Sequence, residues 1–172
     1  MRKQFRLPLK MPVYIKRMFA RDVIKTIIER TESGVDVNGR SFARYSEAYK
    51  SAQIFKDMGK NDNVNLRLFG DMKEALTFHV NVAGVEISFA DMQEAAKAHG
   101  HNFGGGNLPR REWLWLSQDE ETKLLAQYER LMNRVLNDDA TLALIDKYDI
   151  KTPDTDQPTP GAFGVDIETF ER

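Results

Sequence analysis

The stretch TFHVNVAGVEISF, residues 77 to 89, carries the clearest structural signal in this chain and decides its fold class. Apolar and polar residues alternate along it in two runs that flank the dipeptide Ala83-Gly84. The apolar positions are Phe78, Val80 and Val82 before the dipeptide, and Val85, Ile87 and Phe89 after it. A period of two places such side chains on one face of a strand, and Ala83-Gly84 can turn the chain. The stretch therefore predicts a β-hairpin with one apolar face and with His79 on the opposite face.

Two helical patterns lie upstream of the hairpin. Pro12 suits the first turn of a helix, apolar residues recur after it at helical spacing, and Gly34 ends the pattern. Ser46 is a suitable N-cap for a second, shorter helix that ends near Gly59. We therefore expect a long helix followed by a short one in this part of the chain.

The residues just before the hairpin combine an extended pattern with a short helix. Leu66 and Leu68 alternate with polar residues until Gly70 breaks the run. Asp71 and Glu74 then have the spacing of a capping box, which predicts one or two helical turns.

Two further capping boxes follow the hairpin. Asp91 with Glu94 begins a short helix that we expect to end at Gly100. Ser117 with Glu120 begins a long helix whose apolar residues form one stripe. The stripe consists of Leu124, Leu125, Tyr128, Leu131, Met132, Val135 and Leu136.

Together these elements predict an α+β fold, in which an N-terminal helix and a long C-terminal helix pack a small antiparallel sheet that contains the hairpin. We expect a single domain over residues 1–150, with a last short helix at 140–148. Residues 151–172 are rich in Pro, Thr and Asp, which predicts an extended C-terminal arm.

Composition limits the classes of protein to consider. The chain has 172 residues, 41% of them hydrophobic, and a formal net charge of −1. Basic residues dominate before residue 31 and acidic residues after residue 113, so copies can pair head to tail, although two solvated faces explain the pattern equally well. The absence of cysteine excludes disulfides and thiolate sites and fits assembly in a reducing cytoplasm. We expect neither a signal peptide nor a membrane span.

Two interpretations suit residues 97–117, KAHGHNFGGGNLPRREWLWLS: an active site and an assembly element. Trp113 and Trp115 alternate with leucines, which predicts a short strand that is apolar on both faces. One face can then contact a neighbouring subunit, or both can be buried within the chain. Arg110 and Arg111 can pair with carboxylates of a partner. The glycines Gly104, Gly105 and Gly106 predict a mobile loop that orders on assembly.

The sequence signals for a phosphate-binding, metal or catalytic site are weaker than those for assembly. The triple glycine follows a helix instead of preceding one, which does not suit a phosphate loop. His99 and His101 lack the further ligands that a metal site needs. The carboxylate pairs sit where helices begin, so capping explains them, and no nucleophile elbow is present. We therefore expect a protein that is not an enzyme and holds no cofactor and no metal.

Several of these residues, taken in order, carry a resemblance to a known family. They are Asn38-Gly39, Phe42, Tyr45-Ser46, Tyr49, the stretch VNLRLFGDM at 64–72, AKAHGHNFG, and LPRREWLWLS. The order and spacing over residues 13–137 resemble the phage virion morphogenesis family of tail completion and neck proteins. The matching family positions are Leu66, Leu68, Gly70 and Met72, then His99 and Gly100, then Pro109, Arg110, Arg111 and Trp113. Trp113 stands where the family usually has phenylalanine, and the arm from residue 151 extends past the usual end.

The resemblance implies a structural component of the virion at the head–tail junction. It implies a homo-oligomeric ring, six- or twelve-fold, assembled in the host cytoplasm, that contacts connector and tail proteins and lies near DNA in the channel. As candidate contacts with subunits or partners we expect Arg17, Arg21, Gly104, Gly105, Gly106, Arg110, Arg111, Trp113 and Trp115. The alternative is a nucleic-acid-binding protein that uses the basic N-terminal helix.

Overall fold

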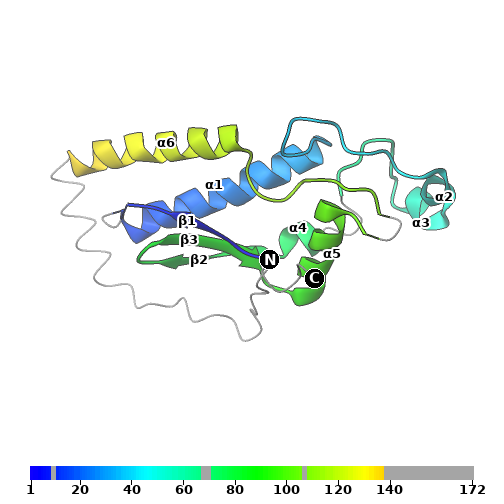
Figure 1. Ribbon diagram of the computed structural model, residues 1–172, viewed down its shortest axis with the longest axis horizontal. Helices are drawn as coiled ribbons and strands as arrows, with labels where there is room; N and C mark the ends of the chain where they lie inside the picture. The colour runs from blue at the N-terminus through cyan, green and yellow to red at the C-terminus, as the bar shows by residue number, and fades with distance from the viewer. Residues whose placement is uncertain (9–10, 67–70, 106–107, 138–172) are drawn as a thin grey trace.

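The computed structural model describes residues 1–8, 11–66, 71–105 and 108–137. The sheet contains β1 (Lys3–Arg6), β2 (Leu76–Asn81) and β3 (Gly84–Phe89) in the order β1-β3-β2, with both neighbours antiparallel to β3. Mixed helices and strands with a small antiparallel sheet confirm the predicted α+β class. Figure 1 shows the sheet below two long helices.

The predicted hairpin is confirmed as β2 and β3, with a shifted turn. Asn81 pairs with Gly84, so the turn residues are Val82 and Ala83 instead of Ala83 and Gly84. Val82 consequently points into solvent with 78% of its surface exposed and does not belong to the apolar face. His79 is exposed on the opposite face, as the alternation predicts.

Strand β1 was not predicted, and it depends on a glycine of the hairpin. It joins the sheet by pairing with β3, with Phe5 opposite Val85 and Arg6 opposite Gly84. A Cβ atom added to Gly84 would lie 1.9 Å from the carbonyl oxygen of Phe5. Only glycine therefore lets the two backbones approach closely enough to pair here.

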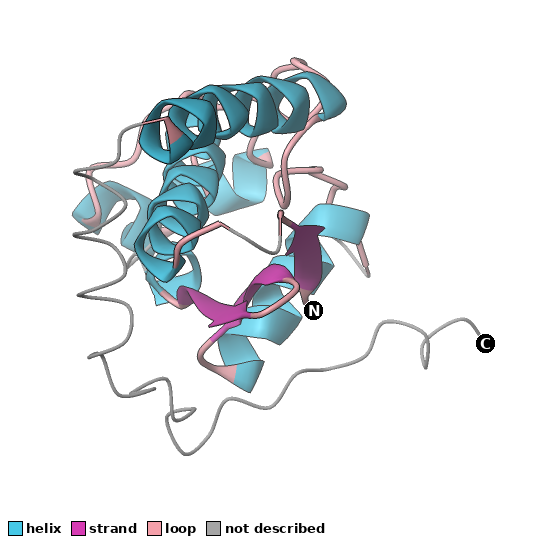
Figure 2. Cartoon of the chain, turned by 90° about the vertical axis from the view of Figure 1, so that its left-hand side faces the viewer, coloured by secondary structure: helices cyan, strands magenta, loops and turns pink. Residues whose placement is uncertain are grey.

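Helix α1 (Val13–Glu32) packs on the sheet, and α6 (Gln118–Leu136) packs on α1. Figure 2, which looks along these helices, shows the three layers in succession. Edge-to-face contacts join the layers, because the ring of Phe19 in α1 meets Phe5 of β1 at 5.5 Å and Tyr128 of α6 at 5.3 Å. Lys3 of β1 also pairs with Glu121 of α6 at 2.8 Å.

The predicted signals at the ends of the long helices are present. Pro12 directly precedes α1, and Gly34, with φ of 80°, follows its end. The capping box at the start of α6 is complete, since the Ser117 side chain accepts from the Glu120 N–H and the Glu120 carboxylate accepts from the Ser117 N–H. These local hydrogen bonds satisfy N–H groups that a helix start leaves without partners.

The short helices differ in detail from the predicted ones. The single helix expected after Ser46 is divided into α2 (Glu47–Ser51) and α3 (Gln53–Asp57), and α4 (Asp71–Glu74) is one turn long. Leu66 has φ of 51°, and residues 60–66 form no strand. Leu68 and Gly70, the helix expected at 140–148 and the arm at 151–172 lie outside the described residues.

Helix α5 (Met92–Phe103) begins at the predicted N-cap but ends later than expected. The Asp91 carboxylate accepts from the N–H groups of Gln93 and Glu94. The helix then continues through Gly100 and ends before Gly104, which has φ of 75°. His99 and Gly100 are therefore inside the helix and do not terminate it, because the chain leaves the helix at Gly104, whose positive φ favours glycine.

Candidate assembly site

The segment 109–117, predicted as a strand with one face for a partner, is an irregular connection fastened to α5. The Arg111 N–H donates to the carbonyl oxygen of His101 at 2.8 Å, and the Leu114 N–H donates to the Asn102 side chain at 3.0 Å. The indole of Trp113 donates to the carbonyl oxygen of Ala98 at 3.4 Å. The prediction of a strand is wrong for this segment, because these side-chain and backbone contacts replace a ladder.

Trp113 belongs to the core of the chain. Its exposed fraction is 0%, and it is the largest fully buried side chain among the described residues. Trp115 is half-buried and has φ of 71°, a left-handed conformation that non-glycine residues rarely adopt. The reversal of the backbone at Trp115 breaks the alternation suggested by the sequence. Of the two alternatives left open, burial within the chain is the one observed for Trp113, which is therefore not a contact for a partner.

Arg111 is also used inside the chain. Only 5% of its surface is exposed, and its Nε and Nη2 donate to the carbonyl oxygen of Ala43 at 3.1 and 3.0 Å. The guanidinium lies 5.8 Å from the centre of the Tyr45 ring, and burial lowers its pKa. The predicted pairing of Arg111 with a partner's carboxylate is thus wrong, because backbone carbonyls take its donors. Arg110, in contrast, is exposed and pairs with Glu112 at 3.0 Å.

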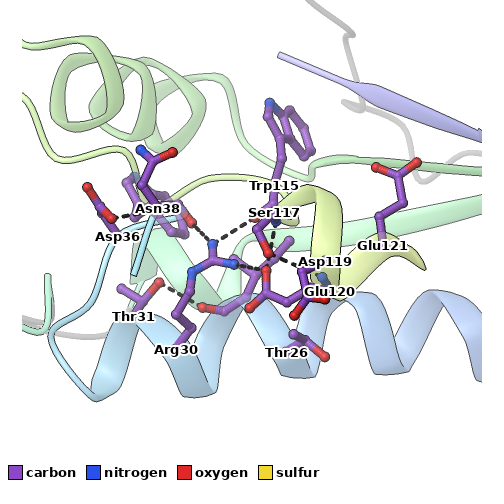
Figure 3. Close-up of polar contacts among 12 residues, drawn as sticks. Thr26, Arg30, Thr31, Asp36, Asn38, Trp115, Ser117, Asp119, Glu120 and Glu121 are labelled. Atoms are coloured by element: carbon purple, nitrogen blue, oxygen red, sulfur yellow. Dashed lines mark hydrogen bonds and ion pairs between the residues drawn. The ribbon is translucent and has the colours of Figure 1, made fainter. Parts of the chain in front are cut away.

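A second arginine, Arg30, is largely buried, with 10% of its side chain exposed, and it was not singled out by the sequence. Figure 3 shows its guanidinium between α1 and the start of α6. Nη2 donates to the carbonyl oxygens of Trp113 and Trp115, the latter at 2.7 Å, and Nη1 pairs with Glu120. Burial lowers the pKa of Arg30, and the Glu120 carboxylate opposes that shift. Its position in the last turn of α1 was the only available signal, because its acceptors lie more than eighty residues further along the chain.

The described part of the glycine run forms a defined turn. Gly104 has φ of 75°, and a Cβ atom there would lie 3.2 Å from the Arg110 nitrogen and 3.3 Å from the Leu108 oxygen. Gly105 and Leu108 exchange backbone hydrogen bonds. Gly106 lies outside the described residues. Gly104 therefore has a structural role in letting the chain return toward α5, and ordering on assembly stays a prediction.

The remaining family positions have different environments. Met72 is buried in the core with 8% of its surface exposed, and Pro109 is exposed. His99 is exposed on α5, where its ring lies 4.7 Å from that of Phe103. Gly100 faces Leu108, whose Cδ1 would be 3.6 Å from an added Cβ atom.

The basic face of α1 is smaller than its sequence suggests. Lys16 has only 3% of its surface exposed, and its ammonium donates to the carbonyl oxygens of Asn81 and Val82 at 3.1 and 2.9 Å. Burial lowers the pKa of this lysine. Arg21 is exposed and Arg17 is partly exposed. These two arginines are therefore still accessible as candidate contacts, whereas Lys16 holds the hairpin turn against α1.

His99 and His101 lie on different sides of α5. His99 points outward, whereas the buried Nδ1 of His101 has no hydrogen-bond partner among the described groups. Burial, and secondarily Arg111, lowers the pKa of His101. Within the described ranges, no three His, Asp or Glu side chains are arranged to hold a metal ion. None of the described helices combines the length and apolar character needed to cross a membrane.

Comparison with known proteins adds no relative: no protein family, no curated protein and no solved structure matches this chain. The structure alone therefore divides the candidate assembly residues into internal and accessible ones. Arg111 and Trp113 are internal, whereas Arg17, Arg21, Gly105, Arg110 and part of Trp115 are accessible.

Proposed function

We propose that this chain is a structural protein of a tailed-phage virion that assembles as a ring at the head–tail junction and helps to join tail to head. One observation carries the proposal: three segments that resemble the family pack against one another. The Val37 N–H donates to the Glu112 carbonyl oxygen at 2.8 Å, beside the Arg111 contact with Ala43 and the Trp113 contact with Ala98. The segments that carry the resemblance therefore contact one another, which supports the proposal of a shared fold.

This packing also gives the family-like residues a structural role. They fix the fold, and the contacts with connector and tail proteins would use exposed residues instead. Arg21 and Arg110 are the exposed arginines among the candidates, and the side chain of Arg110 is 61% exposed. Exposed arginines suit interfaces, because the planar guanidinium binds carboxylates at two points. In this proposal the protein carries out no reaction and needs no cofactor.

Particles that lack the protein provide the test. The gene would be deleted from the phage that encodes it, and the resulting particles would be imaged by electron microscopy. Full heads beside detached tails are expected, and wild-type protein supplied from a plasmid should restore joined particles. A plasmid that encodes Trp113→Asp provides the matched control, because a charge at this fully buried position should prevent folding. Normal virions without the protein would contradict the proposal.

A nucleic-acid-binding protein is the second candidate, favoured by the exposed cations Arg21 and Lys25 on α1. Such binding would depend on phosphate contacts and would weaken steeply with salt. Titration of duplex DNA at several salt concentrations, with wild type and Arg21→Gln/Lys25→Gln, distinguishes the two. Strong binding that is lost in the double variant would favour this candidate.

A further inference from the structure

Helix α5 buries small residues and exposes larger ones. Ala95, Ala98 and Asn102 are buried, whereas Met92 is 52% and Phe103 is 46% exposed. The exposed residues that follow one line along the helix, here called the α5 stripe, are Met92, Ala96, His99 and Phe103. Their spacing of four, three and four residues is that of a helix–helix seam. Exposed apolar stripes of this kind mark interaction surfaces.

Helix α1 exposes a second stripe with the same spacing. The α1 stripe consists of Tyr14, Met18, Arg21 and Lys25. The sheet and α6 cover other sides of this helix, but Tyr14 is 39% and Met18 is 44% exposed. The first half of the α1 stripe is thus apolar, and the second half is basic.

We propose that the α1 stripe of one copy packs antiparallel on the α5 stripe of a neighbouring copy. Because the spacing of each stripe is the same in both directions, all four positions come into register. Tyr14 then meets Phe103, Met18 meets His99, Arg21 meets Ala96, and Lys25 meets Met92. The alignment places aromatic and apolar groups together at one end, and the small Ala96 leaves room for the long arginine stem.

The charges select this orientation over the parallel one. Asp91 caps the start of α5 and is exposed, and the antiparallel alignment brings the basic half of the α1 stripe, Arg21 and Lys25, to that end of the helix. A parallel alignment would place the cations beside Phe103 instead. Complementary charges across an interface fix its register in this way.

Such a contact joins two different surfaces. Each copy would offer one α1 stripe and one α5 stripe, so every junction leaves a free stripe at both ends. A heterologous contact of this type either closes as a ring or continues as a filament. The inference therefore rests on the ring assembly proposed above and assigns it one subunit interface.

Engineered cysteines test the register directly, because the chain has no cysteine of its own. The double variant Met18→Cys/His99→Cys should form a ladder of disulfide-linked species on oxidation. The control Val82→Cys/His99→Cys places one thiol at the hairpin turn, where Val82 is 78% exposed but outside both stripes. A ladder from the first variant and not from the control is expected. Equal cross-linking in both would overturn the proposal.

Complementation of defective surfaces tests the heterologous character. Met18→Glu and Phe103→Glu should each sediment as a single chain of 19.8 kDa. Their mixture should give a species of twice that mass, because one variant keeps the α5 stripe and the other keeps the α1 stripe. Dimers of Met18→Glu alone would show an α5–α5 contact and overturn the proposal.

Different outcomes disprove the α1–α5 contact and the head–tail role. Rings that form without any cross-link between Met18→Cys and His99→Cys would disprove the α1–α5 contact and leave the ring intact. Mixed dimers of the glutamate variants, combined with normal virions in the absence of the protein, would disprove the head–tail role and leave the contact intact.

Discussion

Arg30 and Trp115, eighty-five residues apart in the sequence, are joined by a hydrogen bond of 2.7 Å from the guanidinium Nη2 to the tryptophan carbonyl oxygen. The bond holds a residue whose φ of 71° is unfavourable for any side chain with a Cβ atom. Because Arg30 also binds the Trp113 carbonyl and the Glu120 carboxylate, one side chain connects α1, the 109–117 segment and the start of α6. The long helices and the family-like segment are thereby coupled.

Substitution of this arginine should be among the most damaging changes in the chain. Arg30→Ala removes three charge-assisted hydrogen bonds, leaves the carbonyl oxygens of Trp113 and Trp115 without this donor, and leaves Glu120 with the Ser117 N–H but without its cation. We expect the free energy of unfolding to fall by about 3 kcal/mol, measured by denaturant titration. Lys123→Ala is the matched control, since its pair with Asp119 is exposed to solvent and surface pairs contribute little to stability. Equal losses in the two variants would contradict the role assigned to Arg30.

The strain at Trp115 gives a prediction that reverses the usual order of alanine and glycine. Trp115→Gly and Trp115→Ala lose the same indole contacts, but only glycine adopts a positive φ without cost. The glycine variant should be more stable by about 1 kcal/mol. At Ala126, inside α6, replacement by glycine should instead destabilise by about 1 kcal/mol. Thermal unfolding of the three variants checks both signs, and a more stable Trp115→Ala would refute the strain.

The sequence predicted those elements whose signals are local. Alternation is sufficient for the β2–β3 hairpin, and the capping box at Ser117 and Glu120 fixes the start of α6, because both depend on residues close in sequence. Strand β1 has one buried apolar residue, Phe5, and becomes a strand only by pairing with β3. Its formation depends on contacts about eighty residues away, which no local pattern contains.

The conformation of the candidate site was less predictable, because it too depends on contacts between residues that are distant in the sequence. The alternation Trp-Leu-Trp-Leu predicts a strand, but the left-handed backbone at Trp115 is stabilised by the distant Arg30. Paired arginines at 110 and 111 look equivalent in sequence, yet one is exposed and the other is bound to Ala43. Which arginine is available to a partner is decided by tertiary packing.

Two adjacent glycines of the run should respond differently to the same substitution. Gly104→Ala places a methyl group 3.2 Å from the Arg110 nitrogen at φ of 75°, whereas a Cβ atom on Gly105 meets nothing within 4 Å. We expect Gly104→Ala to lower the free energy of unfolding by about 2 kcal/mol and Gly105→Ala to change it by less than about 0.5 kcal/mol. Chemical denaturation measures both. Similar small effects would indicate that the turn is not constrained.

Stability should also depend on the protonation of His101. Burial, with a smaller contribution from Arg111, lowers the pKa of this histidine below its ordinary value of 6.5. Between that value and the lower pKa of the folded state, the unfolded chain binds more protons. The free energy of unfolding is therefore unaffected by His101 above about pH 6.5. As the pH falls below that value, the free energy of unfolding decreases by at most about 1.4 kcal/mol per pH unit. Denaturation of wild type and His101→Gln between pH 7.5 and 5 should show a shallower slope in the variant. His79→Gln, which alters an imidazole exposed on the outer face of the sheet, is the matched control. A slope that is unchanged in His101→Gln would assign the pH dependence to other groups.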